Sequence, residues 1–359
     1  MIRKGQYNLP SWEKFESMVD GIFDRKYYTN HGPLLIELES KLEIFFKVKH
    51  AICMTNTDIA KMITLKALDL QGDVLVPSFS HISNSQSIIW ASLTPRHYDL
   101  NNDKAVNSVP KESDINKNTT AIIGACNFGD SSHVNNLIQL AKKNNLKLLL
   151  DSVEVIGQKN NGTIHGGYGD AEIFSFNECQ SIVNGGDGGC VTTNDNELAA
   201  RLRNIRSSYG ARHPVSIPYT GNGRMSEIQA GLILISLEEY EANKLNNKRK
   251  YNLYFSALNH LDGVSIFTPP SSNSDLNYQR IVMILDDKHI TKRKDLLSFL
   301  EKQGVGNSLI EFGLDPITLE ELNYNNSDIK NRIIELPIGA LSTEEDIKML
   351  TNAIIAILK

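Results

Sequence analysis

The sequence predicts an α/β fold in which a mostly parallel, seven-stranded sheet carries helices on both faces, followed by a smaller C-terminal α+β domain. The first observation is that short β-rich runs alternate with helical patterns through the first 200 residues, which is typical of parallel strands joined by crossover helices. The second is that runs such as LKLLLD are almost continuously apolar, as expected of strands that are buried on both sides.

The elements of the large domain follow from apolar spacing. A helical pattern covers residues 34–45, with Pro33 at its first position. The predicted strands are Ala51–Met54, Asp73–Val76, Arg96–Asp99, Thr120–Ala125, Leu146–Asp151, Ala171–Phe176 and Cys190–Thr193. The predicted helices between them include Ile59–Leu70, Val134–Asn144 and Glu197–Ser207.

The last third of the chain predicts a second unit. A long helical pattern from Met225 to Leu258 leads into it, and we place the domain boundary after residue 245, giving domains 1–245 and 246–359. The elements predicted beyond it are a strand at Tyr278–Leu285, a helix at Lys292–Gln303 and a closing helix at Thr343–Ile357, with capping-box spacing between Thr343 and Asp346.

Composition excludes several classes of function. The net charge of -5 provides no basic surface for nucleic acid. The longest apolar runs, such as 231–237, are too short to span a bilayer, and the N-terminal segment lacks the apolar core of a signal peptide. The four cysteines show no CxxC spacing, so we expect no metal site and no disulfide framework. We therefore expect a cytoplasmic protein that binds neither membrane nor nucleic acid.

Ligands of open α/β sheets bind at the carboxyl ends of the strands, where this chain places several polar side chains. Asp151 ends one strand, where it can pair with a cationic ring nitrogen or simply cap the next turn. Ser175 lies in a Phe-Ser-Phe strand, where it can offer a hydroxyl to a phosphate or be an ordinary strand serine.

Asn56, Thr57 and Asp58 open a predicted helix directly after a strand. Backbone N–H groups at such a position can hold an anion. The alternative is an ordinary N-cap, which Asn and Asp form readily. We favour the N-cap, because Asp58 would bring its own negative charge into a phosphate site.

His81 and Glu154 are the candidate proton carriers. His81 follows another strand end and can stack on a planar ligand or transfer a proton, or it can be a structural histidine. Glu154 lies three residues after Asp151, where it can act as a general acid or base if it is buried, or be a solvated loop acid.

Residues 169–194, GDAEIFSFNECQSIVNGGDGGCVTTN, resemble the cofactor-lysine segment of the DegT-type nucleotide-sugar aminotransferases. That family consists of fold-type-I enzymes dependent on pyridoxal phosphate (PLP), in which a lysine forms a Schiff base with the cofactor. Counting from Phe176 puts Gln180 at the lysine position, and counting back from the glycines puts Ser181 there. Neither side chain can form an imine, so the resemblance implies a divergent member that lacks the Schiff-base lysine.

The resemblance covers nearly the whole chain, through GPLLIELE, VPSFSHISNSQSI, LKLLLDSVEVIG, GNGRMSEIQAGL and ELPIGALSTEEDI. It implies that Asp151 stands for the aspartate that pairs with the pyridine nitrogen, and Glu154 for a glutamine near the ring. It also implies that His81 stands where an aromatic residue stacks on the ring. Asn222 would reach the phosphate in the neighbouring subunit, so a homodimer is expected.

The departures from the family pattern gather in the cofactor pocket. The lysine is missing, and the Ser-Gly-Thr phosphate turn has become Thr55-Asn56-Thr57-Asp58. We expect an enzyme that acts on a nucleotide-linked sugar, in surface-polysaccharide (O-antigen) or deoxyamino-sugar biosynthesis, without covalent PLP. The alternatives are an enzyme that uses PLP or pyridoxamine phosphate (PMP) noncovalently, as a dehydratase or aminotransferase, and a catalytically silent nucleotide-sugar-binding subunit.

Overall fold

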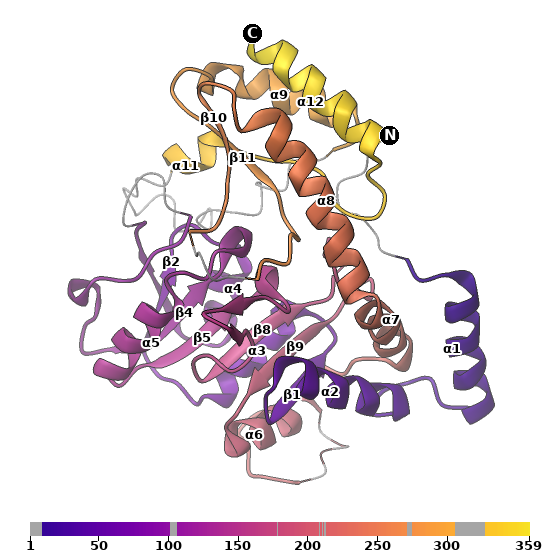
Figure 1. The fold of residues 1–359 in the computed structure, drawn as a ribbon. Coiled ribbons are helices and arrows are strands. Elements are labelled where there is room, and N and C mark those ends of the chain that lie inside the picture. The colour runs from indigo at the N-terminus through magenta and orange to yellow at the C-terminus, as the bar shows by residue number, and fades with distance from the viewer. Residues whose placement is uncertain are drawn as a thin grey trace.

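The computed structural model describes residues 9–100, 106–177, 179–207, 209, 211, 213–270, 275–305 and 327–359. A seven-stranded sheet in the order β1-β9-β8-β5-β4-β2-β3 forms the centre of the large domain (Figure 1). Its strands are β1 (His50–Met54), β2 (Asp73–Pro77), β3 (Thr94–Tyr98), β4 (Thr119–Ala125), β5 (Lys147–Asp151), β8 (Ala171–Ser175) and β9 (Gly189–Thr193). The predicted fold class is confirmed, and each strand begins and ends within two residues of its predicted bounds.

The sheet is mostly parallel. β3, β2, β4, β5 and β8 pair in parallel, and only β9 runs antiparallel, to β8 on one side and β1 on the other. The parallel strands therefore point their carboxyl ends toward one edge, where the polar residues that follow them can meet.

Helices cover both faces of the sheet. One face packs against α3 (Thr57–Ala67), α4 (Ser83–Trp90) and α6 (Asn196–Arg206), and the other against α2 (Pro33–Phe46), α5 (Val134–Lys143) and α7 (Glu227–Glu238). Alternate strand residues supply the two cores: Ile52 and Met54 face α3, while Ala51 and Cys53 face α2. This period of two is the signature of strands buried on both sides.

Two motifs that are distant in the sequence, GPLLIELE and GNGRMSEIQAGL, meet at the start of α2. Glu227 is fully buried, and its carboxylate accepts the backbone N–H groups of Leu34 at 3.0 Å and Leu35 at 3.1 Å. Pro33 occupies the first turn of this helix, and Gly32 provides no side-chain cap. Glu227 therefore satisfies donors that the helix cannot satisfy locally.

The long helix predicted from Met225 to Leu258 is in fact two helices. α7 ends at Glu238 and α8 (Tyr240–Leu258) begins after Glu239, whose φ of -91° and ψ of 2° interrupt the helical backbone. The residues across this junction, 236–242, are SLEEYEA and contain no Gly or Pro, so the sequence alone could not locate the break. The domain boundary predicted after residue 245 lies within α8, and its position remains a prediction.

A smaller, antiparallel sheet lies at the other end of α8 (Figure 1). The predicted strand Tyr278–Leu285 is wrong in its first half, because Tyr278 has a left-handed φ of 57° and regular pairing starts at Val282. The predicted capping box of the last helix is confirmed at Thr343 and Asp346. The elements here are β10 (Val264–Ile266), β11 (Val282–Leu285), β12 (Ile333–Glu335), α9 (Arg293–Lys302), α11 (Ser327–Arg332) and α12 (Glu344–Leu358).

The remaining elements are short or peripheral. They are α1 (Trp12–Arg25), η1 (Glu112–Asp114), η2 (Asn127–Gly129), η3 (Val153–Val155), η4 (Ile290–Lys292), β6 (Lys159–Asn160) and β7 (Thr163–Ile164). Among the helices that the structure describes, none is long and apolar enough to cross a membrane.

Candidate active site

A pocket of about 370 Å³ opens at the carboxyl ends of the strands. It brings together most of the residues that the sequence predicted, although these come from the ends of four separate strands, β1, β2, β5 and β8. Its lining residues are Asn56, Thr57, Asp58, Lys61, His81, Ser83, Cys126, Asn127, Asp151, Val153, Glu154, Ser175, Asn177, Cys179, Gln180, Asp187 and Arg280.

Ser181 and Asn222 do not line this pocket. The Ser181 hydroxyl donates to the Gln279 carbonyl at 3.0 Å and accepts from the Asn247 amide at 2.9 Å, so it faces the C-terminal part of the chain. Asn222 is exposed and forms an isolated bridge with Ser207. Of the two positions considered for the missing lysine, only Gln180 faces the pocket.

The largest addition to the predicted site is Lys61, a residue of α3 that sequence reasoning missed. Its side chain is almost completely buried, and its Nζ lies 2.8 Å from Asp151 Oδ2 and 3.0 Å from Ser83 Oγ. The signal in the sequence was its position four residues after Thr57, which puts it one helical turn along the face that begins at the strand ends. A buried ammonium requires such partners, because desolvation of an unpaired charge is costly.

Asp151 is fixed as an anion. Burial by itself would raise the pKa of this carboxyl, but the Lys61 charge and hydrogen bond outweigh it and hold the pKa below its usual range. The position that was expected to pair with a ring nitrogen is thus ionised and already holds a cation from its own chain.

His81 and Ser83 continue this network toward the open part of the pocket. The backbone N–H of Ser83 donates to His81 Nδ1 at 3.2 Å, and the Ser83 hydroxyl lies 2.9 Å from the same nitrogen. Since Nδ1 accepts from the backbone, we assign the ring proton to Nε2, and the single lone pair of Nδ1 is shared by the Ser83 N–H and hydroxyl. His81 is only partly buried, so it is the most accessible ionisable member of the group.

Asn56 is the N-cap of α3, and its side chain accepts the backbone N–H of Ile59 at 2.9 Å. Thr57 Oγ1 contacts the Gly188 carbonyl at 3.5 Å, and Asp58 is exposed at the pocket rim. A Cβ at Gly189 would lie 2.6 Å from the Asn56 carbonyl oxygen, so this position in the glycine run permits close approach of β9 to α3.

Ser175 and Gln180 close the side of the pocket formed by β8. Ser175 is buried, and its hydroxyl lies 3.4 Å from the backbone nitrogen of Asn177. Gln180 is buried as well and accepts a hydrogen bond from the side-chain amide of Gln279. Gln279 also donates to the Val153 carbonyl at 3.2 Å, which fixes this wall against η3.

Glu154 faces a second cation, Arg280, that no local motif indicated. Its Oε1 lies 3.1 Å from Arg280 Nε, and its Oε2 accepts the backbone N–H of Phe128. The guanidinium also pairs with Glu335 at 2.6 Å. Burial raises the pKa of Glu154, and Glu335 adds to this rise, while Arg280 opposes it.

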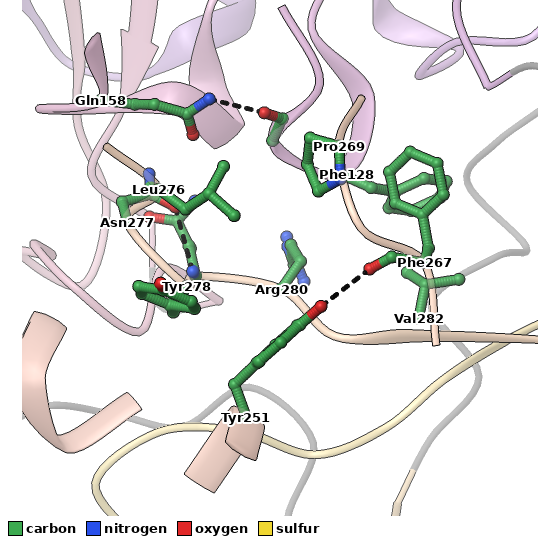
Figure 2. Close-up of a pocket in the computed structure, with 12 residues that line it drawn as sticks. Phe128, Gln158, Tyr251, Phe267, Pro269, Leu276, Asn277, Tyr278, Arg280 and Val282 are labelled. Carbon is green, nitrogen blue, oxygen red and sulfur yellow. Dashed lines mark hydrogen bonds between the residues drawn. The ribbon is translucent and has the colours of Figure 1, made fainter. Parts of the chain in front are cut away.

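Arg280 also borders a second, much smaller cavity of about 20 Å³, roughly the space of one water molecule. Figure 2 shows its side chain between Tyr251 and Phe128, and Tyr251 donates to the Phe267 carbonyl at 3.3 Å. Asn277 binds the neighbouring carbonyls of Glu154 and Ile156, at 3.1 and 3.0 Å. Residues 277–280 therefore bring the C-terminal part of the chain to the wall of the pocket.

The residues present do not fit PLP as its enzymes hold it. Gln180 and Ser181 offer no primary amine, Lys61 already pairs with Asp151, and the helix start carries Asp58. The described part of the chain also contains no group of three or more His, Cys, Asp or Glu side chains able to hold a metal ion.

Comparison with known proteins places this geometry in a family. The model of the DegT/DnrJ/EryC1/StrS aminotransferase family matches residues 11–355. A dTDP-4-amino-4,6-dideoxy-D-glucose transaminase of Escherichia coli is 27% identical over 367 residues, covering 98% of this chain and 97% of that protein.

Solved structures share the fold. The crystal structure of DesI in the presence of its TDP-sugar product superposes with a TM-score of 0.90 at 24% identity, covering 99% of this chain and 93% of that one. The PLP form of the putative sugar aminotransferase Spr1654 from Streptococcus pneumoniae has a TM-score of 0.85 at 17% identity, covering 98% of each chain. The family match over nearly the full length, together with these shared elements, shows that the chain belongs to the DegT/DnrJ/EryC1/StrS aminotransferase family.

Proposed function

We propose that this protein binds a nucleotide-linked sugar in the strand-end pocket and acts on it by proton transfer, without a covalently held PLP. The observation that carries the proposal is a pocket of about 370 Å³ in which Gln180 faces the interior while His81, Asp151 and Glu154 remain as ionisable groups. The activity named for the Escherichia coli relative supports the substrate class. We place the reaction in surface-polysaccharide or deoxyamino-sugar biosynthesis, in the cytoplasm.

His81 is the proton carrier that the geometry favours. It is partly exposed to the pocket, and the Ser83 backbone and hydroxyl orient its ring. Glu154 is the second candidate, because burial raises its pKa toward the range where a carboxyl can exchange protons. Both oxygens of Glu154 already have partners, so it also serves to hold Arg280 in place.

One observation favours a silent binding subunit as the second candidate. Among the described pocket residues, the lysine and arginine cations are Lys61 and Arg280, and both are paired with carboxylates of the same chain. This leaves less positive charge for stabilising a reacting anion. A noncovalent PMP enzyme is the third candidate, and the occupied Asp151 argues against it.

We infer that the protein is a homodimer in which Asn222 contributes to the partner's site. Asn222 is exposed and lies outside the pocket of its own chain, as such a role requires. The exposed aromatic residues Trp12, Phe23, Tyr28 and Tyr209 provide apolar surface for an isologous contact. Light scattering at micromolar concentration should give the mass of a dimer, and a monomer would contradict this proposal.

The proposed function is tested with calorimetry on a panel of UDP-, dTDP-, GDP- and CDP-linked sugars, followed by mass spectrometry of the sugar after incubation. At least one should bind and be converted.

His81→Ala and Glu154→Gln should then slow turnover by roughly two to four orders of magnitude, the usual contribution of a general acid or base. His260→Ala, at an exposed histidine outside the pocket, is the matched control and should leave turnover unchanged. Absence of any binder would refute the proposal, and binding without turnover would establish the silent subunit.

A further inference from the structure

Lys61 lies at the centre of a closed polar network. Its relative exposure is 2%, and its ammonium makes hydrogen bonds to Asp151 Oδ2 and Ser83 Oγ at 2.8 and 3.0 Å. Lysine is rarely buried to this extent unless it is paired. These two bonds satisfy two of the three N–H donors of the ammonium.

The network is oriented from Lys61 outward. Lys61 donates to the Ser83 hydroxyl, which is bonded in turn to His81 Nδ1 at 2.9 Å. Lys61 of α3 therefore supplies the counter-charge of Asp151. Ser83, which binds Lys61, also orients the ring of His81. Removal of the ammonium would leave the Asp151 carboxylate buried without a counter-ion, so it would favour binding of another cation.

We propose that Lys61 replaces the cofactor: its ammonium makes, from within the chain, the ion pair with Asp151 that the protonated ring nitrogen of PLP or PMP would otherwise make. This closes the site to noncovalent as well as covalent cofactor. The inference deepens the proposed cofactor-independent function and rests on it only for the assignment of this pocket as the site.

The charge of the pocket points the same way. Among the described lining residues, four carboxyl groups face two cationic groups, and both cationic groups are already paired. A cofactor phosphate would add further negative charge beside Asp58, at a helix start whose dipole offers only about half a positive charge. The lining carboxyl groups are Asp58, Asp151, Glu154 and Asp187.

The test measures cofactor binding rather than activity, with the purified full chain. Wild type, Lys61→Met, Gln180→Lys and the double variant are each titrated with PMP by calorimetry. Each is then treated with PLP and borohydride, and peptide mapping locates any pyridoxyl group. Lys61→Met should bind PMP at least about ten-fold more tightly than wild type, since it leaves Asp151 available to the ring nitrogen. The double variant should acquire a pyridoxyl group at position 180, and Gln180→Lys alone should acquire at least about ten-fold less.

Lys66→Met is the matched control. Lys66 lies on the same helix but outside the pocket lining, with its Nζ over the Tyr219 ring at 4.7 Å. It should bind PMP no better than wild type does. If Lys61→Met fails to fold, Lys61→Gln retains hydrogen-bonding capacity at similar length and takes its place in the series.

Three results would overturn the inference. They are tight PMP binding by wild type, equal labelling of Gln180→Lys and the double variant, and a pyridoxyl group on Lys61 of wild type. The first needs no variant, so the inference can be refuted even if every Lys61 variant misfolds. A different outcome would separate the two proposals. If wild type binds no nucleotide sugar but Lys61→Met gains PMP binding, the proposed function is refuted and the inference about Lys61 stands.

Discussion

The pocket contains two buried pairs of a cation and a carboxylate that look alike and behave differently. Lys61 and Asp151 lie within the large sheet and its helix α3, and each is the other's only charged partner within ion-pair distance among the described residues. Arg280 and Glu154 join the C-terminal part of the chain to the large domain, and Arg280 is shared with Glu335. Lys61 thus neutralises one carboxylate, whereas Arg280 is shared by two.

This difference decides the direction of each pKa. Burial raises the pKa of both carboxyl groups, and in Asp151 the Lys61 ammonium, together with smaller contributions from His81 and Asn84, more than offsets this rise. In Glu154 the attraction of Arg280 is opposed by Glu335, so the effect of burial prevails and the pKa rises. Equal burial therefore does not imply an equal proton affinity, because the number of carboxylates that share each cation also matters.

Asp151→Asn should give the largest loss of stability. The variant keeps the shape of the side chain but leaves the Lys61 ammonium buried without a counter-charge, which costs about 3–5 kcal/mol in the free energy of unfolding. Urea titration measures it. Asp262→Asn, which removes the exposed partner of Lys288, is the control and should have no measurable effect. A similarly small effect for Asp151→Asn would show that Lys61 has no need of this carboxylate.

The pH dependence of stability should have opposite signs for the two carboxylates. The lowered pKa of Asp151 contributes stability that is present above about pH 4 and is lost as the pH falls through the folded-state value. The raised pKa of Glu154 contributes stability that is fully present below about pH 4 and is lost as the pH rises through the folded-state value.

Relative to wild type, Asp151→Asn should therefore lose stability and Glu154→Gln should gain it as the pH is raised from about 3 to 7. Each slope is at most about 1.4 kcal/mol per pH unit for one proton. Unfolding titrations at several pH values measure both slopes, and parallel slopes would contradict the comparison.

Asn56→Ala tests the helix that carries Lys61. The side chain of Asn56 accepts the Ile59 N–H at 2.9 Å, so its loss should cost about 1 kcal/mol of stability. Chemical denaturation measures this, with Asn252→Ala at an exposed position of α8 as a control that should not destabilise. A neutral Asn56→Ala would mean that the cap contributes nothing to the placement of α3.

Glu154→Gln should give the smallest loss of stability near neutral pH, about 1 kcal/mol or less. Arg280 keeps Glu335 as its counter-ion, and the amide oxygen can still accept the Phe128 N–H. Like Asp151→Asn, this change replaces a carboxylate by an amide. The ratio of the two losses in unfolding free energy therefore compares a cation with two carboxylate partners to a cation with one. Equal losses would show that Glu335 does not compensate.

The fold class, the positions of the strands along the chain and the set of strand-end residues could all be predicted from the sequence. Alternating apolar positions commit each strand to a sheet buried on both sides, and strand ends of a parallel sheet must meet at one edge. His81, Asp151 and Ser175 could therefore be expected at one edge of the sheet from their positions, whereas Gln180 was identified through the family resemblance. Local capping chemistry likewise identified Thr343 and Asp346 in advance.

The partners of these residues depend on how distant elements pack together, which the sequence does not reveal. Lys61 reads as one polar residue in a helical pattern, and its ion pair with Asp151 joins positions 90 residues apart. Arg280 reaches Glu154 from a segment that carries no local signal, and Ser181 turns away from the pocket although it adjoins Gln180. Charge compensation in a buried site depends on distances between elements, whereas periodicity and capping depend on neighbours along the chain, so only the second kind of information could be predicted from the sequence.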